Sequence, residues 1–336
     1  MNNLTAPALA FCALGYGLIT RARNAFYDSG VLHSYTSALP VISVGNLTAG
    51  GNSKTPLCIY LAKGMLARGA KPVILCRGYG GSVKGPVLVT AGRTAKEVGD
   101  EPLMMAQDYG LTVVVARDRV DGARFIEEGK LGNLIILDDG FQHRALSRAL
   151  DILSVNVADE KAIQSFLHGR ILPWGRFREN REAGLKRAHV IVFAERRPAK
   201  SPEIDPRLLA GLPPTIKAYR SIVVPQGLFD KDGKRYLGHE VVAFSGIANP
   251  EGFLETLAHL RLKIMGTEIF PDHHPFSEKN IDDLRAKYPD LALVCTEKDA
   301  IKLTRYNCHG IYALKTQLEV HPADAIFGDV ERAMRP

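Results

Sequence analysis

Lys54 and Thr55 are the residues whose types and spacing point most directly to chemistry. They close the segment Val41-Ile-Ser-Val-Gly-Asn-Leu-Thr-Ala-Gly-Gly-Asn-Ser-Lys-Thr55, in which an apolar run enters a glycine-rich loop. A bound triphosphate needs inward backbone N–H groups, a cation on its outer phosphates and a hydroxyl for the metal. The loop offers all three, and its candidate phosphate-binding residues are Gly50, Gly51, Asn52, Ser53, Lys54 and Thr55.

This loop departs from the Walker A pattern at two positions. The pattern has glycine six residues before the lysine and again directly before it, where this sequence has Thr48 and Ser53. Spacing alone therefore leaves a chance glycine-rich turn open as an alternative. A serine at position 53 with positive φ would cost roughly 1–2 kcal/mol.

A second candidate group is the aliphatic run Leu134–Leu137, which ends in Asp138 and Asp139. In a parallel sheet the carboxyl end of this strand would lie beside the phosphate loop, as in a Walker B strand. Either aspartate could then hold Mg²⁺, directly or through water. A lone strand followed by aspartate usually marks only a turn, so the interpretation depends on the combination with Lys54 and Thr55.

Three further groups carry polar side chains next to predicted element ends. Asp100 and Glu101 are adjacent carboxylates that could act as base and metal ligand, or simply cap a helix. Arg77 and Tyr79 follow a strand and offer a cation and a stacking ring beside a nucleotide or sugar, or form a plain glycine-rich loop. His273 could carry a proton if a carboxylate from the first domain partners it, or could belong to a polar turn.

Composition limits the class of protein. The chain has 336 residues, 46% of them hydrophobic and 24% charged, which is typical of a globular protein. The formal net charge of +7 is compatible with phosphate esters, an anionic membrane or nucleic acid as partner. The five cysteines are widely spaced and odd in number, which argues against a disulfide framework or a structural zinc site.

The elements that must position these groups alternate between short aliphatic runs and amphipathic segments. This pattern predicts a P-loop NTPase-like α/β fold, with a mostly parallel sheet covered by helices on both faces. The predicted strands are Val41–Val44, Pro72–Cys76, Val87–Thr90, Thr112–Ala116, Leu134–Leu137, Ile152–Asn156 and Val190–Ala194. The predicted helices between them are Leu57–Arg68, Pro102–Tyr109 and Val120–Glu128.

A second, smaller α/β unit follows a proline-rich shift in composition between about residues 196 and 240. We place the domain boundary near residue 220, which gives a P-loop domain over 36–220 and a C-terminal domain over 221–336. The second unit has predicted strands and helices at Val241–Phe244, Gly252–Leu260, Glu278–Tyr288, Leu291–Cys295 and Gly310–Leu314.

The N-terminal segment, residues 1–35, is set apart by its charges. Residues 1 to 20 carry no charged side chain, and Arg21 and Arg23 follow. A secretory signal would place its positive charges first, and a spanning helix would need about 20 strongly apolar residues. We expect a helix that lies in one leaflet with its arginines at the head groups, and a buried helix packed on the domain is the alternative.

Taken together, these motifs resemble the tetraacyldisaccharide 4′-kinases, the lipid A 4′-kinases of Gram-negative bacteria. The resemblance covers about residues 40 to 300 in family order. It is carried by the phosphate loop, Arg77-Gly-Tyr-Gly-Gly, Gly99-Asp-Glu-Pro, Asp138-Asp-Gly-Phe-Gln142, Phe244-Ser-Gly-Ile-Ala, Asp272-His273 and Thr296-Glu-Lys-Asp299. Members of this family usually have glycine where Ser53 stands.

The resemblance implies a kinase that uses ATP and Mg²⁺ and phosphorylates the 4′-hydroxyl of a tetraacylated disaccharide 1-phosphate, the lipid A precursor. Asp100 would take the proton, with His273 as its dyad partner. The metal candidates are Thr55, Glu101, Asp138 and Asp139, those near the nucleotide include Gln142 and Arg178, and those near the substrate are Arg77 and Tyr79. The resemblance also implies a peripheral or monotopic protein on the cytoplasmic face of the inner membrane. It implies neither nucleic acid nor an obligate protein partner.

Three other functions compete with this interpretation. A soluble P-loop ATPase for metal or protein targeting would often carry a lysine at position 49, where this sequence has alanine. A non-catalytic nucleotide sensor is suggested by Thr48 and Ser53, but Lys54 and Thr55 are retained. A soluble kinase for a small metabolite would not need the uncharged N-terminus.

Overall fold

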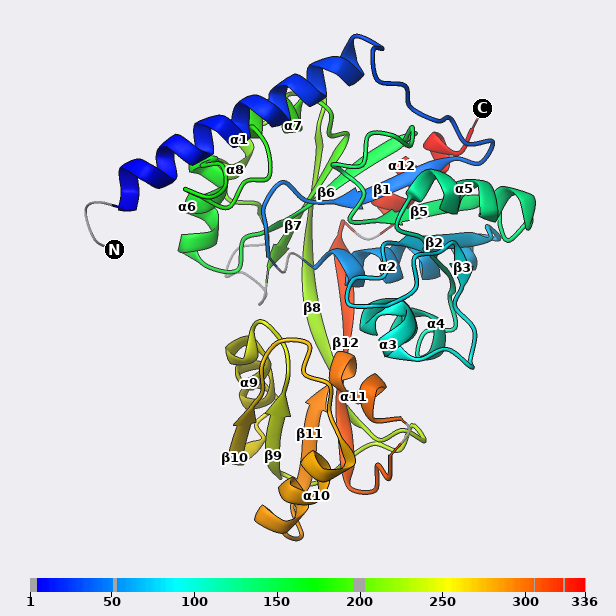
Figure 1. Cartoon of the computed structure of the whole chain (residues 1–336). Helices are drawn as coiled ribbons and strands as arrows, with labels where there is room; N and C mark the ends of the chain where they lie inside the picture. Colours follow the sequence, from blue (N-terminus) through cyan, green and yellow to red (C-terminus); the bar gives the residue numbers. More distant parts are fainter. Residues whose placement is uncertain (1–4, 51–52, 196–202, 305, 323, 336) are drawn as a thin grey trace.

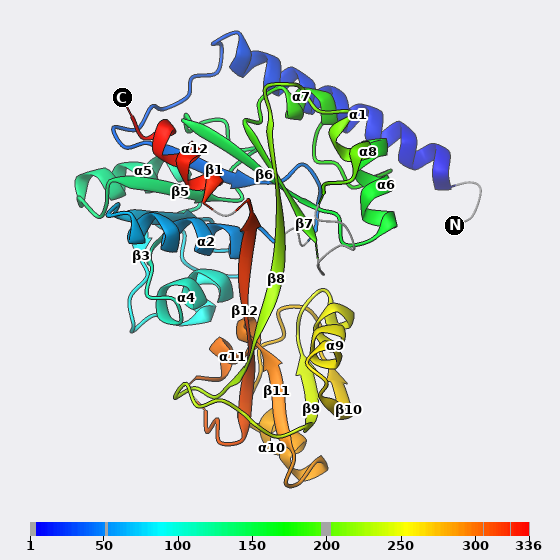
Figure 2. The same ribbon diagram turned by 180° about the vertical axis from the view of Figure 1, so that it is seen from behind.

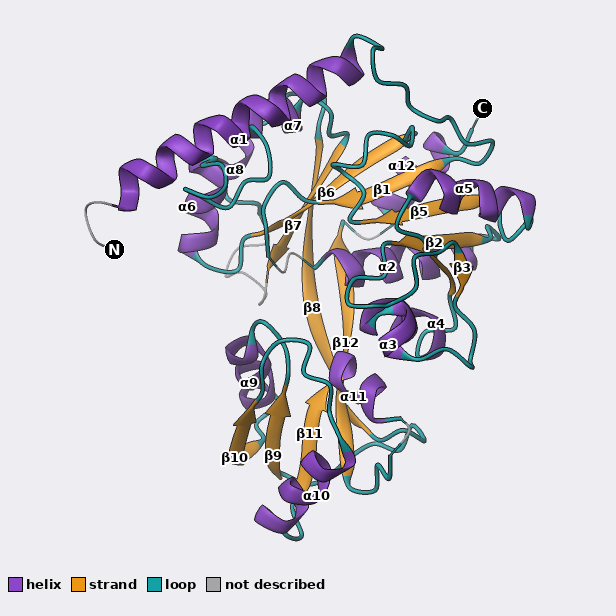
Figure 3. Cartoon of the chain, in the orientation of Figure 1, coloured by secondary structure: helices purple, strands orange, loops and turns teal. Residues whose placement is uncertain are grey.

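A computed structural model describes residues 5–50, 53–195, 203–304, 306–322 and 324–335 of the chain. Its strands form one twelve-stranded sheet, drawn in orange in Figure 3. They are β1 (Val41–Gly45), β2 (Pro72–Cys76), β3 (Val87–Leu88), β4 (Thr112–Val115), β5 (Leu134–Asp138), β6 (Leu150–Asn156), β7 (Val190–Glu195), β8 (Lys217–Phe229), β9 (Glu240–Ser245), β10 (Lys263–Ile269), β11 (Ala292–Thr296) and β12 (Ile311–His321).

Helices cover both faces of this sheet. They are α1 (Thr5–Asp28), α2 (Lys54–Ala67), α3 (Ala95–Val98), α4 (Asp100–Gln107), α5 (Arg119–Glu128), α6 (Glu160–His168), α7 (Arg181–Leu185), α8 (Pro206–Leu209), α9 (Pro250–His259), α10 (Glu278–Lys287), α11 (Glu297–Leu303) and α12 (Ala325–Ala333).

The strand order is β10-β9-β11-β12-β8-β7-β6-β1-β5-β2-β4-β3. Every neighbouring pair is parallel except β12 with β8 and β3 with β4. The sheet therefore consists of two parallel halves that run in opposite directions and meet at β8 and β12. We call them the P-loop half (β1 to β7) and the C-terminal half (β9 to β11).

The two long strands place the carboxyl ends of both halves opposite each other. The start of β8 pairs with β7, and its end pairs with the start of β12, which in turn pairs with β11. In Figures 1 and 2 the C-terminal half lies below the P-loop half, and β8 and β12 connect the two. Because ligands of parallel α/β sheets bind at the carboxyl ends of the strands, the facing edges are the expected location of a site.

The core explains why the strands read as continuous aliphatic runs. Alternate residues of one strand face opposite sides: Ile42 and Val44 pack with α2, α4 and α12, whereas Val41 packs with α5. Phe166 of α6 and Leu185 of α7 cover β6 and β7. Successive side chains of these strands point to opposite faces of the sheet. Because both faces are buried, the side chains on both are apolar.

The predicted α/β fold with helices on both faces is confirmed, with small shifts at element ends. Helix α2 starts at Lys54, three residues before the predicted start, and β3 ends at Leu88, so strand structure was wrongly predicted for residues 89 and 90. No strand was predicted at β8 or β10, and no helix at α3, α6, α8, α11 or α12. The last strand was predicted to end at residue 314, although β12 continues to His321.

The division into two domains at residue 220 stays a prediction. That residue lies inside β8, which pairs with β7 on one side and β12 on the other. The chain also returns to the P-loop half at its end, where the ring of Phe327 in α12 stacks on Tyr60 of α2 at 5.0 Å. Residues 196–202 of the proline-rich stretch lie outside the described residues.

Helix α1 lies across the P-loop half, above α6, α7 and α8 in Figure 1. Tyr16 Oη donates to the Arg178 carbonyl at 2.9 Å, Arg23 donates to the Gln142 carbonyl at 2.9 Å, and Asn24 donates to Glu179 at 2.9 Å. These bonds attach the helix to loops at the edge of the sheet. Among the described residues, no helix has the length and apolar character needed to span a bilayer.

Candidate active site

The phosphate loop leaves the carboxyl end of β1 and enters α2 at Lys54. Ser53, directly before the helix, has φ 54° and ψ 27°, which is the left-handed conformation that Walker A loops usually give to glycine. Lys54 Nζ lies 3.4 Å from an oxygen of Asp139. Gly51 and Asn52 lie outside the described residues, so their predicted contacts with phosphate stay a prediction.

Asp138 and Asp139 reach this loop because β5 pairs with β1 in parallel, with Val44 opposite Asp138. Asp138 is buried and accepts a weak hydrogen bond from the Cys58 thiol at 3.6 Å. Burial, followed by the charges of Glu101 and Asp139, raises the pKa of Asp138 to about 7. This raised pKa identifies a carboxylate whose ionised form a bound cation would stabilise.

Asp139 has the opposite electrostatic surroundings. Burial alone would raise its pKa, but the cations of Lys54 and Arg178 hold the pKa below the usual value. Arg178 Nη1 donates to both oxygens of Asp139, at 2.9 and 3.1 Å, and lies 3.4 Å from Gln142 Oε1. The predicted nucleotide-side residues Gln142 and Arg178 therefore stand in one network with the phosphate-loop lysine.

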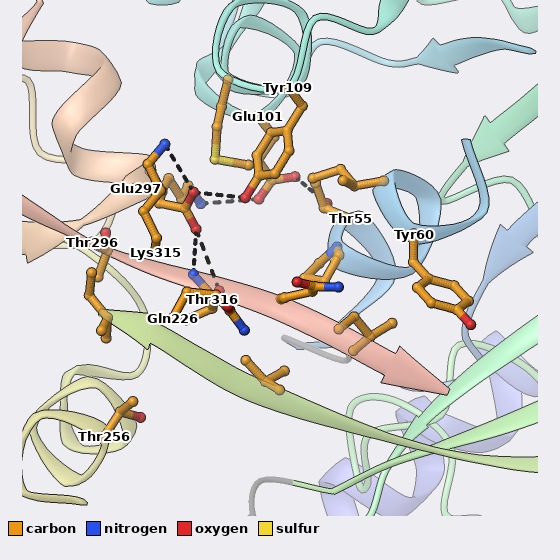
Figure 4. A pocket seen from close by; sticks show the side chains of 18 of the residues that line it. Thr55, Tyr60, Glu101, Tyr109, Gln226, Thr256, Thr296, Glu297, Lys315 and Thr316 are labelled. Atoms are coloured by element: carbon orange, nitrogen blue, oxygen red, sulfur yellow. Dashed lines mark hydrogen bonds and ion pairs between the residues drawn. The ribbon is translucent and has the colours of Figure 1, made fainter. Parts of the chain in front are cut away.

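Glu101 connects the loop to the C-terminal half. The Thr55 hydroxyl donates to one Glu101 oxygen at 3.1 Å, and Lys298 Nζ lies 3.2 Å from the other. Figure 4 shows Thr55 and Glu101 side by side. Lys298 belongs to α11, at the carboxyl end of β11, so this contact crosses from one half of the sheet to the other.

The oxygen donors at this edge fit a magnesium ion. Within the described residues, no group of three or more His, Cys, Asp and Glu side chains is arranged to hold a metal by itself. Mg²⁺ is usually bound through one or two carboxylates together with water and substrate phosphates. The hydroxyl and carboxylates of Thr55, Glu101, Asp138 and Asp139 supply such hard donors beside the phosphate loop.

Asp100 and His273 meet across the two halves. His273 Nδ1 lies 3.0 Å from Asp100 Oδ2, although 173 positions separate them in sequence. The other ring nitrogen of His273 lies 3.3 Å from Lys298 Nζ, and the Tyr79 ring lies 5.5 Å from the imidazole. The alternatives of a plain helix cap for Asp100 and a plain polar turn for His273 do not explain this pairing.

The facing edges enclose a cavity of about 1160 Å³. Its lining includes twelve of the sequence-predicted residues: Gly50, Ser53, Lys54, Thr55, Arg77, Tyr79, Glu101, Asp138, Asp139, Gln142, Arg178 and His273. Asp100 lies behind this surface and reaches it through His273.

Two arginines of this cavity were missed by the sequence analysis. Arg117 and Arg119 follow β4 at the same edge of the sheet, and both line the cavity with Arg77. Arg119 is buried, and burial together with the Arg77 charge lowers its pKa. The signal was present in the sequence, because two arginines directly follow the aliphatic run 112–116.

A second cavity of about 840 Å³ lies beside the first and shares Thr55, Glu101 and Lys298 with it. Figure 4 shows Glu297 among the side chains that line it. Glu297 accepts hydrogen bonds from the Tyr109 hydroxyl at 2.7 Å and from the Thr316 amide at 3.2 Å. The first bond joins α11 to the segment just after α4, and the second joins it to β12. Helices α4 and α11 carry charged groups that meet at the dyad.

The sheet, the phosphate loop and the paired carboxylates define a nucleotide-binding protein of the P-loop class. A profile of the family described as Tetraacyldisaccharide-1-P 4'-kinase matches residues 5–334. The tetraacyldisaccharide 4'-kinase of Chlorobaculum tepidum is 38% identical over 316 residues, covering 90% of this chain and 88% of its own length. That of Aeromonas hydrophila is 34% identical over 313 residues, covering 93% and 88%. The chain therefore belongs to the tetraacyldisaccharide 4'-kinase family.

A solved structure agrees with this assignment. The crystal structure of the apo form of LpxK from Aquifex aeolicus in complex with ATP superimposes with a TM-score of 0.81 and 28% identity. The match covers 98% of this chain and all of that one. The predicted family, fold, kinase activity and use of ATP are confirmed, and the ATPase, sensor and small-metabolite alternatives are not favoured.

Proposed function

We propose that the cavity between the two halves transfers the γ-phosphate of ATP to the 4′-hydroxyl of a tetraacylated disaccharide 1-phosphate, with Asp100 and His273 accepting the hydroxyl proton. The observation that carries this proposal is the 3.0 Å contact between Asp100 and His273. An alcohol is a poor nucleophile, and a positioned base helps by removing its proton as the bond to phosphorus forms. His273 lines the cavity and Asp100 contacts its imidazole from behind, so the two side chains can take the hydroxyl proton as a pair.

The triphosphate end of ATP lies against Lys54 and the backbone of the phosphate loop. Lys54 offsets charge on the outer phosphates, and Arg178 adds a second cation close to it, since both contact Oδ1 of Asp139. Thr55, Glu101, Asp138 and Asp139 would hold the magnesium ion. When bound, magnesium neutralises the charge that develops on the transferred phosphoryl group.

The acceptor lies on the arginine side of the cavity. Arg77, Arg117 and Arg119 gather there, and the repulsion between the Arg77 and Arg119 charges is relieved by an anion. A phosphomonoester has the charge and acceptor geometry that guanidinium groups bind best. The Tyr79 ring, 76% exposed at the cavity mouth, offers a face against which a sugar can stack.

Helix α1 brings the enzyme to its lipid substrate on the cytoplasmic face of the inner membrane. Four of its large apolar side chains are strongly exposed, namely Phe11, Leu14, Leu18 and Ile19. Contiguous exposed apolar surface of this kind marks a membrane or partner contact. The arginines at positions 21 and 23 lie where anionic head groups would meet the helix.

Substituting the dyad tests the proposal. Asp100→Asn and His273→Ala should each lower kcat by about 10²-fold or more, while KM for ATP stays within about 3-fold, because the phosphate loop is untouched. The rates are measured by transfer of labelled phosphate to a tetraacyl disaccharide 1-phosphate in detergent.

The matched control is His274→Ala, the neighbouring histidine, whose ring stacks on Phe270 at 4.7 Å and does not line the cavity. This control should keep kcat close to that of the unaltered chain. The proposal fails if Asp100→Asn and His273→Ala each keep kcat within about 3-fold of the unaltered chain.

A further inference from the structure

A group of buried charges from α11 lies directly behind Asp100. Lys302 Nζ is 3.4 Å from Asp100 Oδ2 and 3.1 Å from Asp299 Oδ1. The side chains of Lys302 and Asp299 are only 6% and 0% exposed. Asp100 Oδ2 is also the oxygen that contacts His273, so the lysine cation and the imidazole meet at the same atom.

Asp299 supports the histidine through a second route. Its Oδ2 accepts hydrogen bonds from the Gly246 amide at 3.1 Å and from the Thr296 hydroxyl at 2.8 Å. The Gly246 carbonyl in turn accepts from the backbone amide of His273 at 3.0 Å. One fully buried carboxylate therefore connects to both members of the dyad, through Lys302 to Asp100 and through Gly246 to His273.

Stability alone gives a weak reason for this arrangement. Removing two charges from water is expensive, and well-packed apolar residues often replace a buried ion pair with no loss of stability. A buried ion pair does, however, fix the orientation of its two side chains, because each charge must keep its partner within a few ångströms. Here the fixed direction points the Lys302 ammonium at the carboxylate that contacts the histidine.

We propose that Lys302 and Asp299 are positioning residues that hold the Asp100 carboxylate and the His273 backbone in their reactive arrangement. The inference rests on the proposed role of the dyad in phosphoryl transfer. It gives a function to Asp299 in the motif Thr296-Glu-Lys-Asp299, to which the sequence analysis assigned no chemistry, and it adds Lys302 as a new residue.

The test is the split between kcat and KM in Lys302→Gln, assayed in the full chain. We expect kcat to fall about 10²-fold, the effect of a misplacement of about 1 Å, with KM for ATP and for the lipid acceptor within about 3-fold. Lys279→Gln, on the exposed side of α10, is the matched control and should keep both constants.

Removing the Lys302 cation from between Asp100 and Asp299 can also unfold the protein. A second variant, which removes one positive and one negative charge together, is therefore needed. The double substitution Lys302→Gln with Asp299→Asn removes both members of the pair and leaves Asp100 its histidine partner. Its thermal midpoint reports folding, and its kcat should fall as far as that of Lys302→Gln. A folded double variant with unchanged kcat would overturn the inference.

A double-mutant cycle separates positioning from an independent effect. In the Asp100→Asn background, Lys302→Gln should cost less than a further 3-fold or so in kcat, since the group that it positions is already impaired. A full additional loss would show that Lys302 acts elsewhere and would contradict the inference. Absence of transfer by the unaltered, folded chain would instead refute the proposed function.

Discussion

Among the described residues of the phosphate loop, Ser53 is the one non-glycine residue with a positive φ, a backbone conformation that its β-carbon disfavours. A β-carbon in the left-handed region lies close to the following carbonyl, at a cost of roughly 1–2 kcal/mol. The structure gives Ser53 φ 54° and no side-chain hydrogen bond to cap α2. The loop therefore keeps the geometry typical of glycine without the residue that adopts it most easily.

Ser53→Gly should remove this strain, and it should tighten ATP binding up to about 5-fold or leave it unchanged. The reason is that a loop already held in its binding conformation loses less free energy to ordering when ATP binds. The measurement is the Kd for ATP with Mg²⁺ by calorimetry. Ser53→Ala keeps the β-carbon and should bind like the unaltered chain. A loss of affinity above about tenfold in the glycine variant would show that the hydroxyl contacts phosphate.

His143 lines the cavity near its arginines, and burial is the largest influence on its pKa. Burial, with the nearby Arg119, Arg148 and Arg23 charges opposing Asp118, lowers its pKa to about 4 from the usual 6.5. The folded protein therefore holds this imidazole neutral at pH values where the unfolded chain binds a proton. Its contribution to stability is complete above pH 6.5 and is lost as the pH falls through 6.5 towards 4.

His143→Gln should remove this part of the pH dependence. Between pH 7 and pH 4 the free energy of unfolding should fall in both proteins, and it should fall by about 1–2 kcal/mol more in the unaltered chain than in the variant. This value allows for solvent screening of a partly exposed group. Urea unfolding at a series of pH values measures the difference. A constant difference across that range would contradict the surroundings described for His143.

At the scale of elements, α1 is a helix with two different sides. Tyr16, Arg23 and Asn24 attach one side to loops of the P-loop half. The other side presents Phe11, 79% exposed, and Ile19, 70% exposed, to its surroundings. Since each large apolar side chain gains about 1.5–3 kcal/mol on burial, this side favours an apolar partner such as the membrane interior.

Phe11→Glu combined with Ile19→Glu should weaken binding to anionic phospholipid vesicles by at least about tenfold and leave the thermal midpoint unchanged. Co-sedimentation with vesicles measures the binding. Leu237→Glu is the control, because Leu237 is 81% exposed and lies far from α1 in the chain. Vesicle binding that persists in the α1 variant would contradict the membrane role proposed for this helix.

Some elements could be predicted from the sequence because local pattern determines them. The aliphatic strands β1, β2 and β5 are buried on both faces and read as continuous apolar runs. Strand β8 was missed because Pro225 and Gly227 interrupt its pattern, yet it is held by β7 and β12 on its two sides. Tertiary pairing overrides local propensity there. Strand β10, half exposed at the sheet edge, gives an even weaker signal.

At the scale of the whole molecule, the site depends on two halves of a sheet whose carboxyl ends face each other. Residue types and spacing marked Lys54, Asp138, Asp100 and His273 as candidates, and the family resemblance joined Asp100 and His273 as a dyad in the same site. The sequence could not show that β8 and β12 reverse the direction of the second half, which is what brings His273 to Asp100. Lys302 could not be predicted for the same reason, because its role depends on what lies opposite it in space, whereas Arg119 carried a local signal that was overlooked.

The central claim is that this cavity phosphorylates a lipid acceptor. The most direct measurement incubates the full chain with ATP labelled at the γ-phosphate and a tetraacyl disaccharide 1-phosphate in detergent micelles with Mg²⁺, beside Lys54→Ala. The account predicts label at the 4′ position with the unaltered chain and a rate lower by at least about 10²-fold with the variant. A folded chain that binds ATP and leaves the lipid unlabelled would contradict it.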